Sequence, residues 1–155
     1  MNQLIGGDGN DVVVVRGQDS ANGGIGNDTV IVAANGTTVL AGGANADVLR
    51  FDNNYDISAA AVSGFETVEL NYGQTMTVAQ LGSFAVHTGT SISQTSTGVT
   101  LSAGGTATIN AAATLSGTFA IAYSAQADNL TFNAAYAGNV SLNGNGGNDS
   151  VTSGA

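Results

Sequence analysis

Two stretches near the start of the chain decide the fold: Gly6-Gly7-Asp8-Gly9-Asn10-Asp11-Val12-Val13-Val14 and Gly23-Gly24-Ile25-Gly26-Asn27-Asp28-Thr29-Val30-Ile31. Both follow the pattern G-G-x-G-x-D-x-U-x, in which U is a large apolar residue. The first six positions have the glycines and the aspartate of a turn, and the last three alternate as a short, half-buried strand does. A chain that repeats this unit is predicted to coil as turn, strand, turn and strand.

Two further stretches keep the pattern with one asparagine in place of a glycine. Residues 42–50 have Asn45 at the third glycine position, and residues 144–152 have Asn145 at the second. Asparagine tolerates the left-handed backbone conformation better than other residues except glycine. Both turns are therefore still expected to form.

The spacing of the aspartates fits one coil for each pair of nonapeptides. Asp28 follows Asp11 by 17 residues, and Asp47 follows Asp28 by 19. Two nonapeptides place equivalent turns about 18 residues apart. The first three motif turns are therefore expected to stack along one edge of the fold.

These nonapeptides resemble the calcium-binding repeats of the RTX (repeats-in-toxin) family. The resemblance implies an all-β fold, a parallel β-roll or β-solenoid, in which each U side chain points inward. It also implies that Ca²⁺ lies between one turn and the equivalent turn of the next coil, held by aspartate carboxylates and backbone carbonyl groups. Calcium takes six to eight oxygen ligands, more than one aspartate supplies, so the backbone must contribute.

We expect two calcium ions on this edge, one between turns 6–11 and 23–28 and one between turns 23–28 and 42–47. The opposite edge is not expected to bind calcium, because Thr38 stands where its turn would need an aspartate. Ordinary glycine–asparagine turns without a metal are the alternative. The predicted metal ligands, counting side chains and backbone groups, are Gly6, Asp8, Gly9, Asp11, Gly23, Ile25, Gly26, Asp28, Gly42, Ala44, Asn45, Asp47, Gly144, Gly146 and Asp149.

The chain is expected to be one continuous domain and a piece of a longer solenoid. Residues 1–50 are predicted to hold the calcium-binding coils, and residues 51–98 an acidic loop and irregular strands. Residues 99–155 are predicted to form a Thr/Ala-rich solenoid that ends in the last motif turn. Apolar pairs that recur every 8 to 12 residues support this, at Val99/Leu101, Ala107/Ile109, Phe119/Ile121, Leu130/Phe132 and Val140/Leu142.

Three shorter segments in the middle of the chain have their own patterns. The alanine-rich residues 57–62 are expected to form one helical turn. Residues 65–70 alternate apolar and polar side chains and predict a half-buried strand, and residues 76–81 predict the next strand.

Composition excludes several classes of protein. The 155 residues have 11 acidic and only two basic side chains, for a net charge of −9, and no cysteine. Two basic residues cannot neutralise a phosphate backbone or attract an anionic membrane surface, so neither nucleic-acid binding nor membrane insertion is expected. The apolar content of 43% is too high for a disordered chain.

No catalytic constellation is visible, and the chain is not expected to be an enzyme. His87 is the only histidine and is expected to be a strand or turn residue. Glu66 and Glu69 are three residues apart on a predicted strand, so they point to opposite faces and do not form an acid/base pair. Pairs of threonines such as Thr75/Thr77 do not recur at one coil spacing, which disfavours an ice-binding face.

These features together predict a calcium-dependent extracellular structural module, most like bacterial surface-layer proteins or large secreted adhesins. The sequence of residues 63–70 also resembles a phrase found in those proteins. Calcium outside the cell would neutralise the aspartates and couple metal binding to folding. The resemblance implies type I secretion as part of a larger, surface-exposed protein. The expected partners are other copies of the chain, in head-to-tail or lattice contacts, flanking repeats, or a cell-surface glycan. An adhesin segment and a C-terminal accessory β-roll of a secreted enzyme or toxin are the alternatives.

Overall fold

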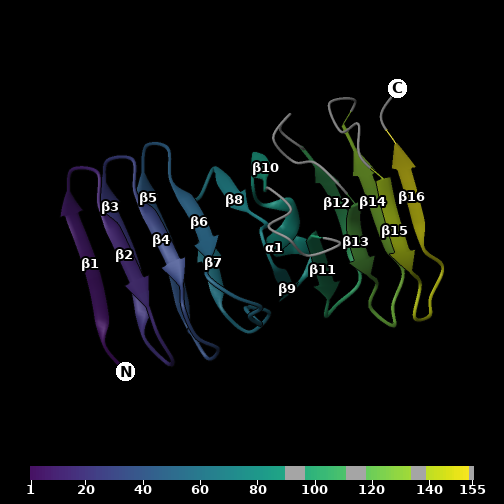
Figure 1. Ribbon diagram of the computed structural model, residues 1–155, viewed down its shortest axis with the longest axis horizontal. Coiled ribbons are helices and arrows are strands. Elements are labelled where there is room, and N and C mark those ends of the chain that lie inside the picture. The colour runs from purple at the N-terminus through teal and green to yellow at the C-terminus, as the bar shows by residue number, and fades with distance from the viewer. Residues whose placement is uncertain (90–96, 111–117, 134–138, 154–155) are drawn as a thin grey trace.

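The computed structural model describes residues 1–89, 97–110, 118–133 and 139–153. Within these residues almost all regular structure is β-strand, and neighbouring strands pair in parallel. The strands stack side by side along the longest axis of the molecule, with the N-terminus at one end and the C-terminus at the other (Figure 1). The predicted parallel β-roll, or β-solenoid, is confirmed.

The N-terminal part of the roll consists of two sheets. The first sheet has the order β1 (Gln3–Asp8), β3 (Ser20–Ile25), β5 (Val39–Ala44) and β7 (Ala61–Ser63). The second has the order β2 (Val12–Val15), β4 (Thr29–Val32), β6 (Val48–Phe51), β8 (Thr67–Glu69) and β10 (Val86–Thr88). Each of the first four coils contributes one strand to each sheet, as the nonapeptide pattern predicts, and β10 extends only the second sheet.

The C-terminal part has the same organisation. One sheet has the order β9 (Gly73–Met76), β11 (Thr97–Leu101), β13 (Thr118–Ala122) and β15 (Asn139–Asn143). The other has the order β12 (Gly105–Ile109), β14 (Asp128–Phe132) and β16 (Ser150–Ser153). The recurring apolar pairs after residue 98 fall on these strands, so this expectation is confirmed.

Stacking in register places like residues above one another in the core. Val13 pairs with Val30, Val30 with Leu49, and Leu49 with Val68. All four are buried. Each buried side chain of this size stabilises the fold by about 1.5–3 kcal/mol relative to an exposed one. The column explains why the U position of the motif must be apolar.

His87 continues this column, because it pairs in register with Val68. Its side chain is fully buried. The ring Nε2 is 2.8 Å from the carbonyl oxygen of Leu81, and the backbone N–H of Asn110 donates to Nδ1 over 3.1 Å. These contacts require a neutral ring that carries its proton on Nε2. His87 is therefore a core strand residue, as the sequence predicted.

One local prediction in the middle of the chain is wrong, and another holds only for part of its range. Residues 76–81 are not a strand, because β9 ends at Met76 and a short helix, α1 (Val78–Gly82), follows. Thr77 begins this helix with a capping box, in which its side chain and that of Gln80 each bond the other's backbone N–H. Residues 57–62 close only a single turn, from the Ala60 N–H to the Ile57 carbonyl, before β7 begins at Ala61.

Burial lowers the pKa of His87 below its usual 6.5. The unfolded chain then binds a proton that the folded chain resists, so the free energy of unfolding should decrease as pH falls below about 6.5. We expect the melting temperature of the wild type to fall more steeply between pH 7.5 and 5 than that of His87→Gln, whose side chain does not titrate. Identical pH profiles for the two proteins would contradict this assignment.

Candidate metal centre

Four acidic side chains stack at one edge of the roll, one for each successive coil. Oδ1 of Asp28 accepts a hydrogen bond from the backbone N–H of Asp11, and Oδ1 of Asp47 accepts one from the N–H of Asp28, each over 2.8 Å. Oε2 of Glu66 accepts from the N–H of Asp47 over the same distance. We call Asp11, Asp28, Asp47 and Glu66 the acid ladder. The carboxylates of Asp28, Asp47 and Glu66 thus each tie their own coil to the preceding one.

The asparagines that precede Asp11 and Asp28 tie the coils together in the opposite sense. Oδ1 of Asn10 accepts from the backbone N–H of Asn27 over 2.8 Å, and Oδ1 of Asn27 accepts from the N–H of Ala46 over 3.0 Å. A short amide side chain here satisfies a backbone donor of the next coil. Both residues of the motif's Asn-Asp pair therefore accept hydrogen bonds that link neighbouring coils.

The second carboxylate oxygen of three ladder residues is buried without a hydrogen-bond partner among the described residues. These oxygens are Oδ2 of Asp11, of Asp28 and of Asp47. The side chains of Asp28 and Asp47 are only 1% and 0% exposed. A buried charge without a partner destabilises a fold by several kcal/mol, unless a cation or donor compensates it.

The protein itself supplies no cation to the acid ladder in the part of the chain that the structure describes. Its only basic residues are Arg16 and Arg50. The guanidinium of Arg50 forms an ion pair with Glu69, with N–O distances of 2.6 and 2.9 Å. No ion pair of Arg16 is found among the described residues. Among the described residues, therefore, no basic side chain is found in an ion pair with the buried carboxylates of the acid ladder.

A glycine beside each of these oxygens leaves room that any side chain would fill. A Cβ built on Gly6 would overlap the carbonyl oxygen of Gly23, and one on Gly23 would overlap that of Gly42. The same Cβ atoms would lie 2.8 Å from Oδ2 of Asp11 and 2.5 Å from Oδ2 of Asp28. A carboxylate and a carbonyl oxygen thus converge on one point in each turn. Oxygen is the ligand that calcium prefers, so these residues fit that ion.

The third glycine position of the motif has a left-handed backbone. Gly9 and Gly26 have φ values of 111° and 135°, and Asn45 has a φ of 89° at the equivalent place. The expectation that asparagine can replace this glycine is confirmed. Because a β-branched or bulky residue is strained in this conformation, the position restricts the sequence independently of any metal.

Burial raises the pKa of Asp47 above its usual value. The hydrogen bond from the Asp28 backbone lowers this pKa, whereas the negative charges of Asp28 and Glu66 raise it further. The environment of Asp47 therefore opposes the ionised form. A bound cation would reverse this balance, because an adjacent positive charge favours the carboxylate.

The x positions of the motif turns lie on the outside. Asp8, Ile25 and Ala44 occupy the same register position, and all three side chains are exposed. The carbonyl oxygens of Ile25 and Ala44 accept hydrogen bonds from the N–H groups of Gly9 and Gly26. Their part in metal binding stays a prediction. The structure assigns these carbonyls to links between coils.

The predicted C-terminal ligands Gly144, Gly146 and Asp149 are not in line with the first three turns. In the view of Figure 1 the turns after β1, β3 and β5 lie along the upper edge, and the turn after β15 lies along the lower edge. Asp149 instead meets Asp128 of the preceding coil, whose backbone N–H donates to its Oδ1 over 3.0 Å. The C-terminal residues form a separate pair of turns.

Asp128 is a buried ladder-type residue that the sequence analysis missed. Its Oδ2 accepts hydrogen bonds from the N–H and the Oγ of Ser124, over 2.7 and 2.8 Å. Its Oδ1 is buried and has no hydrogen-bond partner among the described residues, so Asp128, like Asp28 and Asp47, has one satisfied and one unpartnered carboxylate oxygen. The signal for Asp128 was its place two residues before the inward Leu130, the same spacing as Asp28 to Val30. The glycines of the motif are absent there, so a search for the motif does not find it.

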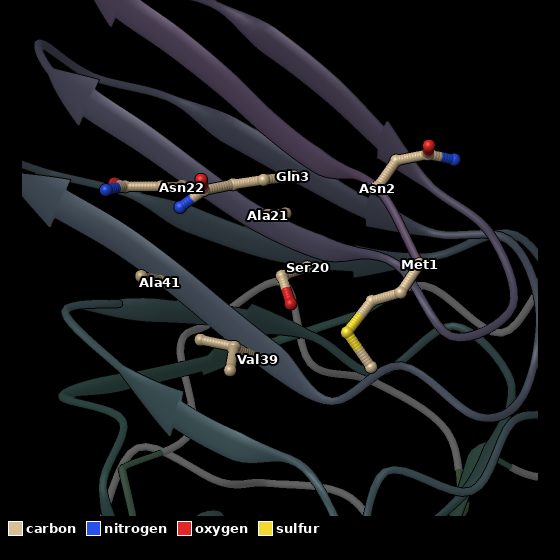
Figure 2. A pocket seen from close by; sticks show the side chains of 8 residues that line it. All are labelled: Met1, Asn2, Gln3, Ser20, Ala21, Asn22, Val39 and Ala41. Carbon is tan, nitrogen blue, oxygen red and sulfur yellow. The ribbon is translucent and has the colours of Figure 1, made fainter.

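No three or more His, Cys, Asp or Glu side chains gather to hold a metal among the described residues. The ladder sites instead combine carboxylates with backbone carbonyl oxygens. A hollow of about 380 Å³ lies elsewhere, on the outer face of β1, β3 and β5. Figure 2 shows Met1, Ser20 and Val39 around it, and none of its eight lining side chains is charged. It offers no acid or base for chemistry.

Comparison of the chain with protein-family models, with curated proteins and with solved structures finds no match. Among the residues that the structure describes, no helix is long and apolar enough to span a bilayer.

The glycine cradle can be tested with Gly23→Ala. The added Cβ would overlap the Gly42 carbonyl and crowd Oδ2 of Asp28, so we expect the free energy of unfolding to decrease by about 1–3 kcal/mol. Gly73→Ala is the control, because its nearest neighbour would be the Asn54 side chain at 3.5 Å. Urea titrations followed by circular dichroism measure both. Equal stabilities of the two variants would argue against the cradle.

The hydrogen bonds from Ser124 to Asp128 can be tested with Ser124→Ala. Removing the Oγ leaves Oδ2 of Asp128 with one donor fewer, so we expect the free energy of unfolding to decrease by about 1–2 kcal/mol. Ser153→Ala, at an exposed strand position, is the control. Urea titrations in EGTA measure both variants without a metal. Equal stabilities of the two variants would argue against the contribution of this hydroxyl.

Proposed function

We propose that this chain is a calcium-dependent extracellular structural module of the RTX type, whose N-terminal coils fold around Ca²⁺. The observation that carries the proposal is the buried Oδ2 of Asp28 and of Asp47, which have no partner among the described residues, while Arg50 is paired with Glu69. Calcium is the favoured cation because the surrounding ligands are carboxylate and carbonyl oxygens, and calcium accepts a variable number of such ligands.

The proposal makes calcium binding and folding one equilibrium. Without the ion, the buried carboxylates repel one another and lack compensation, so the coils of the acid ladder should open. With the ion, each rung gains a positive charge between two coils, and binding free energy becomes folding free energy. Extracellular calcium modules work at about 10⁻⁴–10⁻³ M, so such a module would be open inside a cell and closed outside it.

A role in assembly is part of the same proposal. The strands at the ends of the roll, β1 and β2 on one side and β15 and β16 on the other, pair with a strand on one side only. Such edges present free backbone groups to another strand. Ile5 and Val12 on the first coil and Leu142 and Val151 on the last are exposed apolar side chains. A further coil, from flanking repeats or from a second copy in a surface layer or filament, would cover them.

We do not assign an enzymatic role to the described residues. His87 is buried with both ring nitrogens hydrogen-bonded to the backbone, and Glu69 is paired with Arg50. Export by type I secretion within a larger surface protein and contact with a glycan belong to the proposal only through the resemblance of the motif turns to RTX repeats.

Asp28→Asn tests the calcium mechanism most directly. The amide oxygen of asparagine can still accept the Asp11 N–H, so the inter-coil hydrogen bond remains while the buried charge is removed. We expect the variant to be more stable than the wild type in EGTA and less stable in calcium. It should also bind calcium at least 10-fold more weakly.

Thermal unfolding followed by circular dichroism measures this reversal. One sample contains about 5 mM Ca²⁺, and the other contains EGTA and no free calcium. Asp52→Asn removes the same charge from an exposed loop and should change neither arm. Strand content and melting temperature of the wild type that do not respond to chelation would overturn the proposed function.

A further inference from the structure

We propose that a third calcium ion binds between turn 42–47 and turn 63–66, with Glu66 closing the acid ladder. This inference rests on the proposed calcium function and adds a site where the sequence has no calcium motif. The sequence analysis expected two ions on this edge and treated Glu66 as a strand residue. Its neighbours in the structure give it a different role.

The backbone register places Glu66 directly where the next aspartate of the ladder would stand. Val48 pairs with Thr67, so the residue before each, Asp47 and Glu66, face each other across the two coils. Oε2 of Glu66 accepts the Asp47 N–H over 2.8 Å, the same contact that Asp47 makes with Asp28.

The oxygens that mark the two expected sites recur here. Oδ2 of Asp47 has no partner among the described residues, and its side chain is 0% exposed. A Cβ on Gly42 would lie 2.8 Å from this oxygen and would overlap the carbonyl oxygen of Gly64. A buried, unpartnered carboxylate oxygen and a carbonyl oxygen thus converge on one point, as they do at Gly6 and Gly23.

The third site differs from the others in its outer half. Only Phe65 lies between Gly64 and Glu66, whereas four residues separate Gly42 from Asp47. The turn therefore lacks the loop that carries further carbonyl groups. Phe65 is buried and anchors the short turn, while Glu66 is exposed. Water would complete the coordination, so this site should be the weakest of the three.

A purely structural role for Glu66, as an acceptor for the Asp47 N–H, makes a different prediction. Glutamine keeps an oxygen that can accept this N–H but has no charge for a metal. Under the structural role, Glu66→Gln would bind as many calcium ions as the wild type. Under our proposal, it would bind one ion fewer, and the lost ion would be the weakest.

Calcium stoichiometry, measured by equilibrium dialysis and by isothermal titration calorimetry on the same samples, distinguishes the two. Glu69→Gln is the matched control, since Glu69 ends the strand β8 that directly follows Glu66 but pairs with Arg50. We expect the wild type and Glu69→Gln to bind equal numbers of ions, and Glu66→Gln one fewer. Equal numbers in all three proteins would overturn the third site and leave the proposed function intact. No bound calcium in any of them would overturn both.

A measurement on the wild type keeps the inference testable if Glu66→Gln unfolds. Substoichiometric Mn²⁺ broadens the amide signals of residues close to a calcium site in nuclear magnetic resonance spectra. We expect the amide signals of Gly64 and Glu66 to broaden in addition to those of the motif turns. Excess Ca²⁺ should displace the Mn²⁺ and restore all of these signals. Broadening confined to residues 6–11, 23–28 and 42–47 would overturn the third site.

Discussion

The buried carboxylate oxygen of each ladder residue is the constraint on which the N-terminal coils depend. One oxygen of Asp28 or Asp47 is satisfied by a backbone N–H, and the other is not. The residue beside it must be glycine, because a Cβ there would overlap a carbonyl oxygen. The strand that follows must carry an apolar side chain that packs in the buried column of the core. Charge, turn geometry and core packing therefore meet within nine residues, which is why the pattern is so strict.

The same constraint recurs at both ends of the roll, with different hydrogen-bond donors. Asp28 and Asp47 each accept one backbone N–H of the preceding coil, whereas Oδ2 of Asp128 accepts two hydrogen bonds from Ser124. In all three residues the other carboxylate oxygen is buried without a partner among the described residues. The turn sequence can therefore change while the buried, half-satisfied carboxylate remains.

Most of the fold could be predicted from sequence, because parallel coils repeat their pattern at nearly constant spacing. The strands after residue 98 were found from pairs such as Leu130/Phe132 without any motif. The helix α1 was missed because its apolar residues also fit a strand, and the Thr77–Gln80 capping box decided between the two. Glu66 and Asp128 were missed because their roles come from register across coils, which the sequence does not display locally.

The direction of the ladder hydrogen bonds gives the roll a polarity. The backbone N–H of Asp11 donates to the carboxylate of Asp28, that of Asp28 to Asp47, and that of Asp47 to Glu66. In this contact, the backbone donor of each coil is satisfied by the coil that follows it in the chain and not by the coil before it. The same asymmetry makes the loss of one rung most damaging to the coil on its N-terminal side.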